Sequence, residues 1–283
     1  MTILAIDVGN TRAKLGIWYS LNPTGKSPDQ LTAVPLAGDV DLPEQVKIWL
    51  QQVGGLSIEQ VIIAGSNPKP VAELMASWLA NDFPINQIQS HQQIPLKMDV
   101  KNPETVGIDR LLTAVAVRSR QHQRTPVIVV DAGTATTVNL TTADGMFRGG
   151  AILPGMRMSA QALHDYTAVL PHIDADTFVE HEDANSKTDQ CAVQQSTVTL
   201  KMPGRDTKSA IQNGIFWGHL GSIKELISQL TNHLVATEAP VSELTIAVTG
   251  GGGRQLATLI PAATYEDSLA LIGLSTLAAS SQA

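Results

Sequence analysis

The chain reads Ile6-Asp7-Val8-Gly9-Asn10-Thr11 near its beginning and Val130-Asp131-Ala132-Gly133-Thr134-Ala135 further on, with the two aspartates 124 residues apart. Each stretch follows a short aliphatic run and precedes a second run rich in β-branched and aliphatic residues. This arrangement is typical of two strands joined by a tight turn. Because the pattern occurs twice, we predict two similar halves, each with a carboxylate at the end of a strand and a glycine in the turn.

A third strand is predicted to end in a glycine-rich loop. Residues 244–248 are mostly aliphatic or β-branched, and Thr249-Gly250-Gly251-Gly252-Gly253 follows them directly. Elsewhere, short aliphatic strands alternate with segments of helical spacing, and helices are predicted at 42–53, 71–79, 107–120, 214–236 and 256–260. The alternation predicts an α/β fold in which three strand-to-turn sites converge on one ligand.

The repeated turn has the chemistry of a site for nucleotide phosphates. A carboxylate can hold Mg²⁺ or its water, a glycine lets phosphate oxygens approach the backbone amides, and a threonine hydroxyl adds a hydrogen-bond donor. A single Asp-x-Gly-x-Thr is more often an ordinary hairpin turn. Two copies and the glycine loop together favour a cleft between two lobes, where a kinase or ATPase transfers a γ-phosphoryl group.

A further pair of candidate residues stands at the beginning of the helix predicted at 107–120. Asp109 can accept the proton of a substrate hydroxyl, and Arg110 can hold a carboxylate or a phosphate. An aspartate in the first turn of a helix is also favourable simply because of the helix dipole. Taken alone, this pair leaves both interpretations open.

Composition argues against several other classes of protein. The 283 residues are 43% hydrophobic and 16% charged, which is typical of a folded rather than a disordered protein. The formal charge of −7 argues against nucleic acid as a partner. The single cysteine, Cys191, has no partner for a disulfide within the chain, and the sequence has neither a signal-peptide pattern nor a membrane-spanning apolar run. We therefore expect a cytoplasmic protein without membrane contact.

Six motifs, in order along the chain, resemble those of the type III pantothenate kinases. They are Asp7-Val8-Gly9-Asn10-Thr11, Gly107-Ile108-Asp109-Arg110, Asp131-Ala132-Gly133-Thr134-Ala135-Thr136, Gly149-Gly150-Ala151-Ile152-Leu153-Pro154-Gly155, Thr167-Ala168-Val169-Leu170-Pro171 and Gly204-Arg205-Asp206-Thr207. The resemblance implies an α/β fold of two RNase H-like (actin-like ATPase) domains with mixed sheets flanked by helices, at 1–118 and 119–283. It also implies ATP-dependent phosphorylation of pantothenate, the first step of coenzyme A biosynthesis, by a homodimer.

The resemblance further implies a role for each matching residue. The ATP phosphates would be lined by Asp7, Val8, Gly9, Asn10, Thr11, Arg12, Ala13 and Lys14; ATP would also contact Thr134, and its adenosine side would face Thr249, Gly250, Gly251 and Gly252. Asp7 would hold the Mg²⁺ that accompanies ATP, directly or through water, and Asp131 would bind a monovalent cation, K⁺ or NH₄⁺. Asp109 would be the catalytic base. Pantothenate would be bound by Gly107, Ile108, Asp109, Arg110 and, near the subunit interface, Thr207.

The chain departs from the family pattern in two places. Val100 stands where the family usually has a tyrosine, which puts one contact to pantothenate in doubt, and the polar segment 172–200 is longer than usual. Two alternatives remain: a non-catalytic regulatory protein on the same fold, and an actin-fold kinase for another small acceptor such as a sugar or acetate. We interpret the apolar stripe along 214–236 as core packing in preference to a dimer seam.

Overall fold

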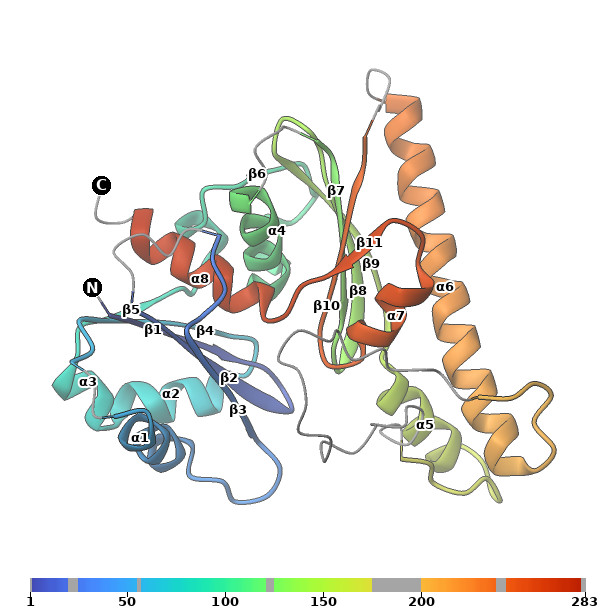
Figure 1. Cartoon of the computed structure of the whole chain (residues 1–283), viewed down its shortest axis with the longest axis horizontal. Coiled ribbons are helices and arrows are strands. Elements are labelled where there is room, and N and C mark those ends of the chain that lie inside the picture. The colour runs from blue at the N-terminus through green and yellow to red at the C-terminus, as the bar shows by residue number, and fades with distance from the viewer. Residues whose placement is uncertain are drawn as a thin grey trace, which may run out of the picture.

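The computed structural model describes residues 2–19, 25–54, 57–120, 125–174, 200–237 and 243–280. It contains two mixed β-sheets, each with helices on both faces (Figure 1). The prediction of an α/β fold with mixed sheets flanked by helices is therefore confirmed. Two helices lie between the sheets and join them into one molecule.

The first sheet has the strand order β3-β2-β1-β4-β5. Its central strand β1 pairs antiparallel with β2 and parallel with β4, so the first predicted strand–turn–strand unit is the middle of this sheet. Helices α1, α2 and α3 cover one face with a continuous apolar core. The bounds are β1 Ile3–Val8, β2 Arg12–Trp18, β3 Gln30–Pro35, β4 Gln60–Gly65, β5 Ile85–Gln87, α1 Leu42–Gln52, α2 Pro68–Ala76 and α3 Trp78–Asp82.

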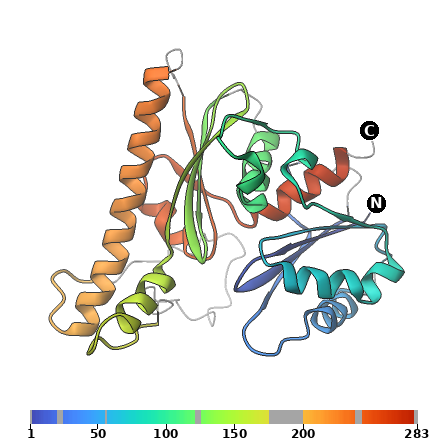
Figure 2. The same ribbon diagram turned by 180° about the vertical axis from the view of Figure 1, so that it is seen from behind.

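The second sheet has the strand order β11-β10-β7-β8-β9-β6, and its β7–β8 hairpin repeats the β1–β2 hairpin of the first. The long helix α6 and the short α7 cover its outer face, and α5 lies beside one end of α6 (Figures 1 and 2). The bounds are β6 Lys97–Met98, β7 Val127–Ala132, β8 Ala135–Thr141, β9 Met146–Pro154, β10 Thr245–Thr249, β11 Ala263–Tyr265, α5 Met156–Asp165, α6 Thr207–Thr237 and α7 Gly253–Leu259; 3-10 turns lie at His91–Gln93 and Pro103–Thr105.

Helices α4 (Ile108–Arg120) and α8 (Leu269–Ser280) lie between the two sheets and share one core with both. At Gly273 the backbone of α8 approaches the carbonyl of Leu112 in α4 so closely that any side chain there would overlap it. Arg120, the last residue of α4, donates to the carbonyl of Gly25 (2.5 Å) and to Ser27 Oγ (3.1 Å), and pairs with Glu266. These contacts link the first lobe to the second.

The apolar stripe of α6 packs as predicted. Phe216, Leu220, Ile223, Ile227 and Leu234 are buried against the second sheet or α5, and Leu230 is half-buried beside them. The interpretation as core packing is therefore confirmed, although the helix begins at Thr207, earlier than the predicted residue 214.

One predicted helix is divided in the structure, and two of the longer strands carried no prediction. The helix expected at 71–79 is two helices, because Ser77 is extended and its side chain accepts from the backbone N–H of Leu79, which begins α3. Strands β3 and β9 were not expected. β3 is an exposed edge strand, and β9 contains two glycines, so neither has the aliphatic run that marks a buried strand.

The division into domains at residues 118 and 119 stays a prediction. β6 precedes this boundary yet pairs with β9 of the second sheet, and α8 follows it yet packs on the first sheet. Most of the polar segment 172–200 lies outside the described residues, and so does Cys191. Among the described residues, no helix is both long and apolar enough to cross a membrane.

Candidate active site

The turn between β1 and β2 places an aspartate and a lysine at opposite positions on the two strands. Asp7 is paired with Lys14 across the antiparallel strands, and the N–H of Gly9 donates to the carbonyl of Arg12 (3.0 Å), which closes the turn. The pKa of Asp7 is raised to about 7, mainly by burial; the charge of Lys14 lowers it, and the charges of Asp109 and Asp131 contribute to the rise. The three aspartates therefore share one electrostatic environment although they come from β1, α4 and β7.

The turn between β7 and β8 meets the first turn directly. Thr11 Oγ1 and Thr134 Oγ1 are 3.0 Å apart and share a hydrogen bond across the cleft. Burial raises the pKa of Asp131 to about 6, with Lys14 lowering it and Asp109 raising it. Two turns that are 123 residues apart in sequence thus face one space, as expected for turns that hold phosphates from both sides.

The glycine-rich loop after β10 packs against the second turn. Thr249 lies opposite Asp131 in the parallel pairing of β10 with β7, and the N–H of Gly252 donates to the carbonyl of Ala132 (3.1 Å). Gly250 has φ +89°, and a Cβ there would lie 2.6 Å from both the Ala132 carbonyl and Asp131 Oδ1. Only glycine can adopt this φ and approach the second turn so closely, so the conformation of the loop depends on glycine at position 250.

Asp109 lies in the first turn of α4, where Gly107 makes room for its carboxylate. A Cβ on Gly107 would lie 2.5 Å from Asp109 Oδ1, and the same oxygen accepts from the backbone N–H of Arg110 (2.9 Å). Asp109 is half-buried. The carboxylate is therefore held in place by backbone close to the other two aspartates, where it can accept a proton.

Arg110 extends from α4 to the second sheet. Its Nε and Nη2 both donate to Asn139 Oδ1 on β8, at 2.8 and 2.5 Å, and its guanidinium lies 5.7 Å from the centre of the Phe147 ring. Burial lowers its pKa, whereas Asp109 raises it. Sequence analysis missed Asn139. The one available signal was an amide inside an otherwise apolar and β-branched strand.

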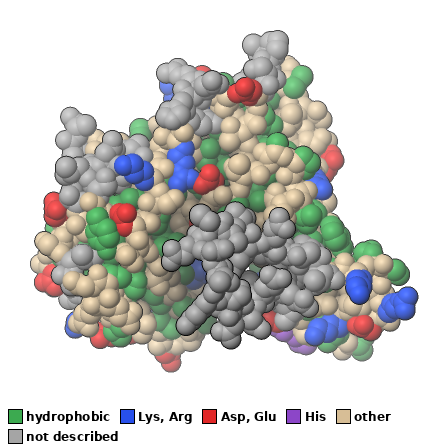
Figure 3. All heavy atoms as spheres, viewed as in Figure 1, with side chains coloured by type: hydrophobic (Ala, Val, Ile, Leu, Met, Phe, Trp, Pro, Cys, Tyr) green, Lys and Arg blue, Asp and Glu red, His purple; other side chains and the backbone are tan. Residues whose placement is uncertain are grey.

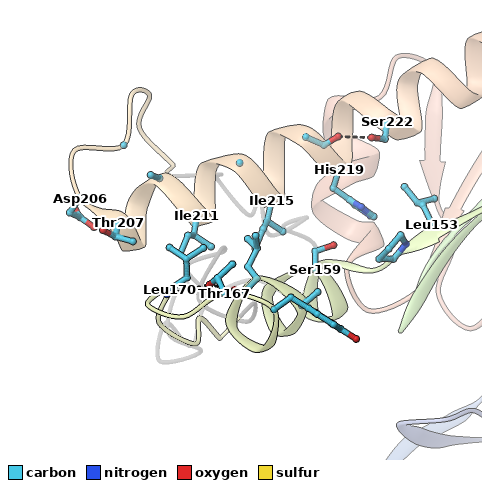
Figure 4. A pocket seen from close by; sticks show the side chains of 18 of the residues that line it. Leu153, Ser159, Thr167, Leu170, Asp206, Thr207, Ile211, Ile215, His219 and Ser222 are labelled. Carbon is cyan, nitrogen blue, oxygen red and sulfur yellow. Dashed lines mark hydrogen bonds between the residues drawn. The ribbon is translucent and has the colours of Figure 1, made fainter.

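Thr207 is the predicted site residue that lies apart from the others. It begins α6, which covers the face of the second sheet opposite α4. It lines a groove of about 1180 Å³ between α5 and α6, where Ile211 and Ile215 face Thr167 and Leu170 (Figure 4). Within one chain the structure does not bring Thr207 beside Asp109. Val100 is half-buried on the core around α4, so it offers no polar group to a substrate.

The donor atoms beside Asp131 fit a bound cation. Thr249 Oγ1 is buried and has no hydrogen-bond partner among the described residues, and it belongs to the residue opposite Asp131. An unpartnered hydroxyl next to a half-buried carboxylate is an oxygen donor set that suits a hard cation. In the part of the chain that the structure describes, no three His, Cys, Asp or Glu side chains form a metal cluster. A magnesium ion here would therefore depend on ATP and water for most of its ligands.

Comparison with solved structures assigns the fold to a class. A putative N-acetylmannosamine kinase from Listeria monocytogenes aligns with a TM-score of 0.51 and 12% identity over 100% of both chains. A protein from Campylobacter jejuni, described as a conserved putative Baf family transcriptional activator, aligns with a TM-score of 0.53 and 17% identity over 99% of this chain and 98% of that one. The fold is that of the sugar kinases and actin-like ATPases.

Comparison of sequences narrows the class to one family. The sequence profile of the type III pantothenate kinases matches residues 3–229. A type III pantothenate kinase of Chlorobaculum parvum is 30% identical over 95% of this chain and 91% of its own, and one of Caulobacter vibrioides is 28% identical over 97% and 95%. The chain belongs to the type III pantothenate kinase family, and it is a kinase.

Proposed function

We propose that this chain transfers the γ-phosphoryl group of ATP to the primary hydroxyl of pantothenate, with Asp109 as the base. The observation that carries the proposal is the joint environment of Asp7, Asp109 and Asp131, which three separate elements bring to the meeting point of two phosphate turns. A non-catalytic regulator has no need of three such carboxylates. The family makes pantothenate the favoured acceptor over a sugar or acetate.

The phosphates of ATP lie between the two turns in this proposal. Backbone amides of residues 8–13 and the amine of Lys14 face them from the first lobe, and Thr134 faces them from the second. The loop 249–252 faces the adenosine. Asp7 would hold Mg²⁺ directly or through water, and the ion would supply positive charge to the phosphates of ATP. Each of these groups acts through position and charge, which is what phosphoryl transfer requires.

The acceptor lies beside α4 in this proposal. Asp109 takes the proton of the primary hydroxyl as the oxygen attacks phosphorus, and the bond from phosphorus to the β-phosphate oxygen breaks, which releases ADP. Gly107 and Ile108 border the hydroxyl end of the substrate, and Arg110 donates hydrogen bonds to its oxygens. Gly107 leaves space for Asp109 Oδ1, so the carboxylate fits at the beginning of α4.

We also propose that Asp131 and Thr249 hold K⁺ or NH₄⁺. Burial raises the pKa of Asp131 to about 6, so the ionised carboxylate is costly at neutral pH without a cation nearby. A bound monovalent cation would offset that cost and use the unpartnered Thr249 hydroxyl. The cation would then stabilise the second turn in the conformation that faces ATP.

The proposal includes a cytoplasmic homodimer. The groove between α5 and α6 is bordered by strongly exposed apolar side chains, Tyr166 at 89% and, close by, Val169 at 86%. Basic side chains gather at the same end of the molecule (Figure 3). A second copy packed there would cover the apolar surface and could bring its Thr207 to the pantothenate site of the first.

The direct test is ADP release by the purified protein with ATP, Mg²⁺ and K⁺, with and without pantothenate. Glucose, N-acetylmannosamine and acetate serve as alternative acceptors, and a K⁺-free reaction tests the cation. We expect release that depends on pantothenate and on K⁺. ADP release only with a sugar or acetate would support a kinase for another small acceptor. No ADP release with any acceptor would support a non-catalytic regulatory protein.

Asp109→Asn tests the base. The amide cannot accept the proton, so we expect kcat to fall by about 100-fold or more while the melting temperature stays within a few degrees of wild type. Steady-state kinetics and thermal melting measure both quantities. Wild-type turnover in this variant would remove Asp109 from the reaction.

A further inference from the structure

Asn139 is the main polar contact of the Arg110 side chain. Its Oδ1 accepts from both Nε (2.8 Å) and Nη2 (2.5 Å) of the guanidinium, and the residue is 1% exposed. A buried polar side chain is costly unless its hydrogen bonds are made. An apolar residue would pack better at this core position. The amide at position 139 therefore indicates a role other than packing.

A second hydrogen bond fixes which way the amide faces. Asn139 Nδ2 donates to Thr137 Oγ1 (2.9 Å), so the amide oxygen is the atom left for Arg110. Thr137 is opposite Asp131 in the pairing of β8 with β7. A chain of contacts therefore runs from the strand of Asp131 through Thr137 and Asn139 to the residue that follows Asp109.

The contact uses only part of the hydrogen-bonding capacity of Arg110. A guanidinium has five N–H donors in a planar fork, and Asn139 Oδ1 takes two of them. Because an amide is neutral, it orients the guanidinium without cancelling its charge. Phe147 lies at 5.7 Å from the guanidinium carbon and restricts it further. The remaining donors stay available to a substrate oxygen beside Asp109.

We infer that Asn139 is a positioning residue for the kinase reaction, which holds the Arg110 guanidinium in the one orientation that binds the acceptor. This inference rests on the proposed function. Asn139 does not touch the substrate in this account; it acts only through Arg110. Its removal should weaken the acceptor site and leave the ATP site, which is built from the turns, unchanged.

The test compares Asn139→Leu, which keeps the size and removes the acceptor, with Asn139→Asp, which keeps an acceptor oxygen. We expect Asn139→Leu to raise KM for pantothenate by about tenfold, the usual scale for losing a hydrogen bond to a charged group, with KM for ATP within twofold. Asn139→Asp should recover part of that loss, because its carboxylate still orients the guanidinium although its charge offsets that of Arg110. Thr141→Val on the same strand is the matched control, and thermal melting reports the fold. Asn139→Ala replaces the leucine variant if that one does not fold.

A double-mutant cycle decides whether Asn139 acts through Arg110. In an Arg110→Ala background, Asn139→Leu should cause no further loss in kcat/KM for pantothenate, because the group that it positions is gone. Losses that multiply, or an equal rise in KM for ATP, would overturn the positioning role. If the wild-type enzyme does not phosphorylate pantothenate at all, the proposed function fails, and that outcome is separate from the result of the cycle.

Discussion

Asp7 and Asp131 are carboxylates in a low-dielectric environment that disfavours their ionised forms. Burial raises their pKa values to about 7 and about 6, and Lys14 offsets part of the effect in both cases. Without cations nearby, the two groups cannot both be charged cheaply at neutral pH. The two carboxylates therefore favour nearby positive charge, such as that of the Mg²⁺ and the monovalent cation proposed above.

This residue-scale electrostatics predicts an unusual pH dependence of stability. Both folded pKa values lie above the ordinary 3.8, so this contribution to stability is complete below about pH 4 and is lost as pH rises through 6 and 7. We expect the melting temperature in a choline buffer, without nucleotide, to fall between pH 5 and pH 8. The melting temperature of Asp131→Asn should fall less over the same pH range, because the amide does not titrate.

Added KCl provides the second half of this measurement. The cation binds the ionised carboxylate, so it should raise the melting temperature of the wild type more at pH 8 than at pH 5. Asp131→Asn should show a much smaller K⁺ effect at both pH values. Equal K⁺ effects on both proteins would contradict the assignment of the cation to Asp131.

At the residue scale, local sequence patterns predicted the three aspartates but not the residues that contact or accompany them. Asp7, Asp109 and Asp131 each stand in a short motif whose chemistry is readable from neighbouring residues. Asn139 binds a residue 29 positions away, and the unpartnered hydroxyl of Thr249 depends on strand pairing. Contacts of this kind are made by the tertiary fold and leave little trace in local sequence.

At the scale of elements, α4 and α8 depend on close backbone contact. Gly273 has no room for a side chain because the carbonyl of Leu112 lies against it. Both helices are almost entirely apolar where they meet, and each contributes to the core that joins the two sheets. A substitution where α4 and α8 cross should therefore destabilise the packing of both lobes.

Gly273→Val is expected to lower the free energy of unfolding by about 1–3 kcal/mol, the usual cost of overpacking a core. Gly221→Ala on α6 is the matched control, because a Cβ there meets open space and alanine favours a helix by up to about 1 kcal/mol. Urea unfolding measures both variants. A Gly273 variant as stable as the Gly221 variant would contradict the close packing.

Elements with strong apolar periodicity were predictable, and those without it were not. The strands β1, β7 and β10 and the helices α1, α4 and α6 all carry aliphatic residues at strand or helix spacing. β3 and β9 form because neighbouring strands provide their hydrogen-bond partners, which composition does not reveal. The break at Ser77 depends on a single capping side chain within an otherwise helical pattern.

At the scale of the whole molecule, the proposed dimer makes a specific prediction. Each pantothenate site would combine Asp109 of one subunit with Thr207 of its partner, because α4 and α6 lie on opposite faces of the second sheet. Sedimentation should give twice the chain mass of 30.1 kDa. A charge beside the groove, such as Val169→Asp, should favour the monomer and reduce activity.

Mixed dimers test whether the site is shared. Asp109→Asn and Thr207→Ala homodimers should both be weakly active. After subunit exchange, each mixed dimer contains one site with both wild-type residues, so we expect activity to return on mixing. No recovery after verified exchange would place Thr207 and Asp109 in the same subunit's site or remove Thr207 from the reaction.

The position of α8 has a consequence for how the chain is made. This helix covers one face of the first sheet, yet it follows β1 by most of the described chain, so it leaves the ribosome long after β1. Until α8 arrives, the apolar face formed by residues such as Ile3 and Ile62 has no cover. During synthesis the first sheet therefore exposes apolar surface until α8 has been made, and such surface is prone to aggregation.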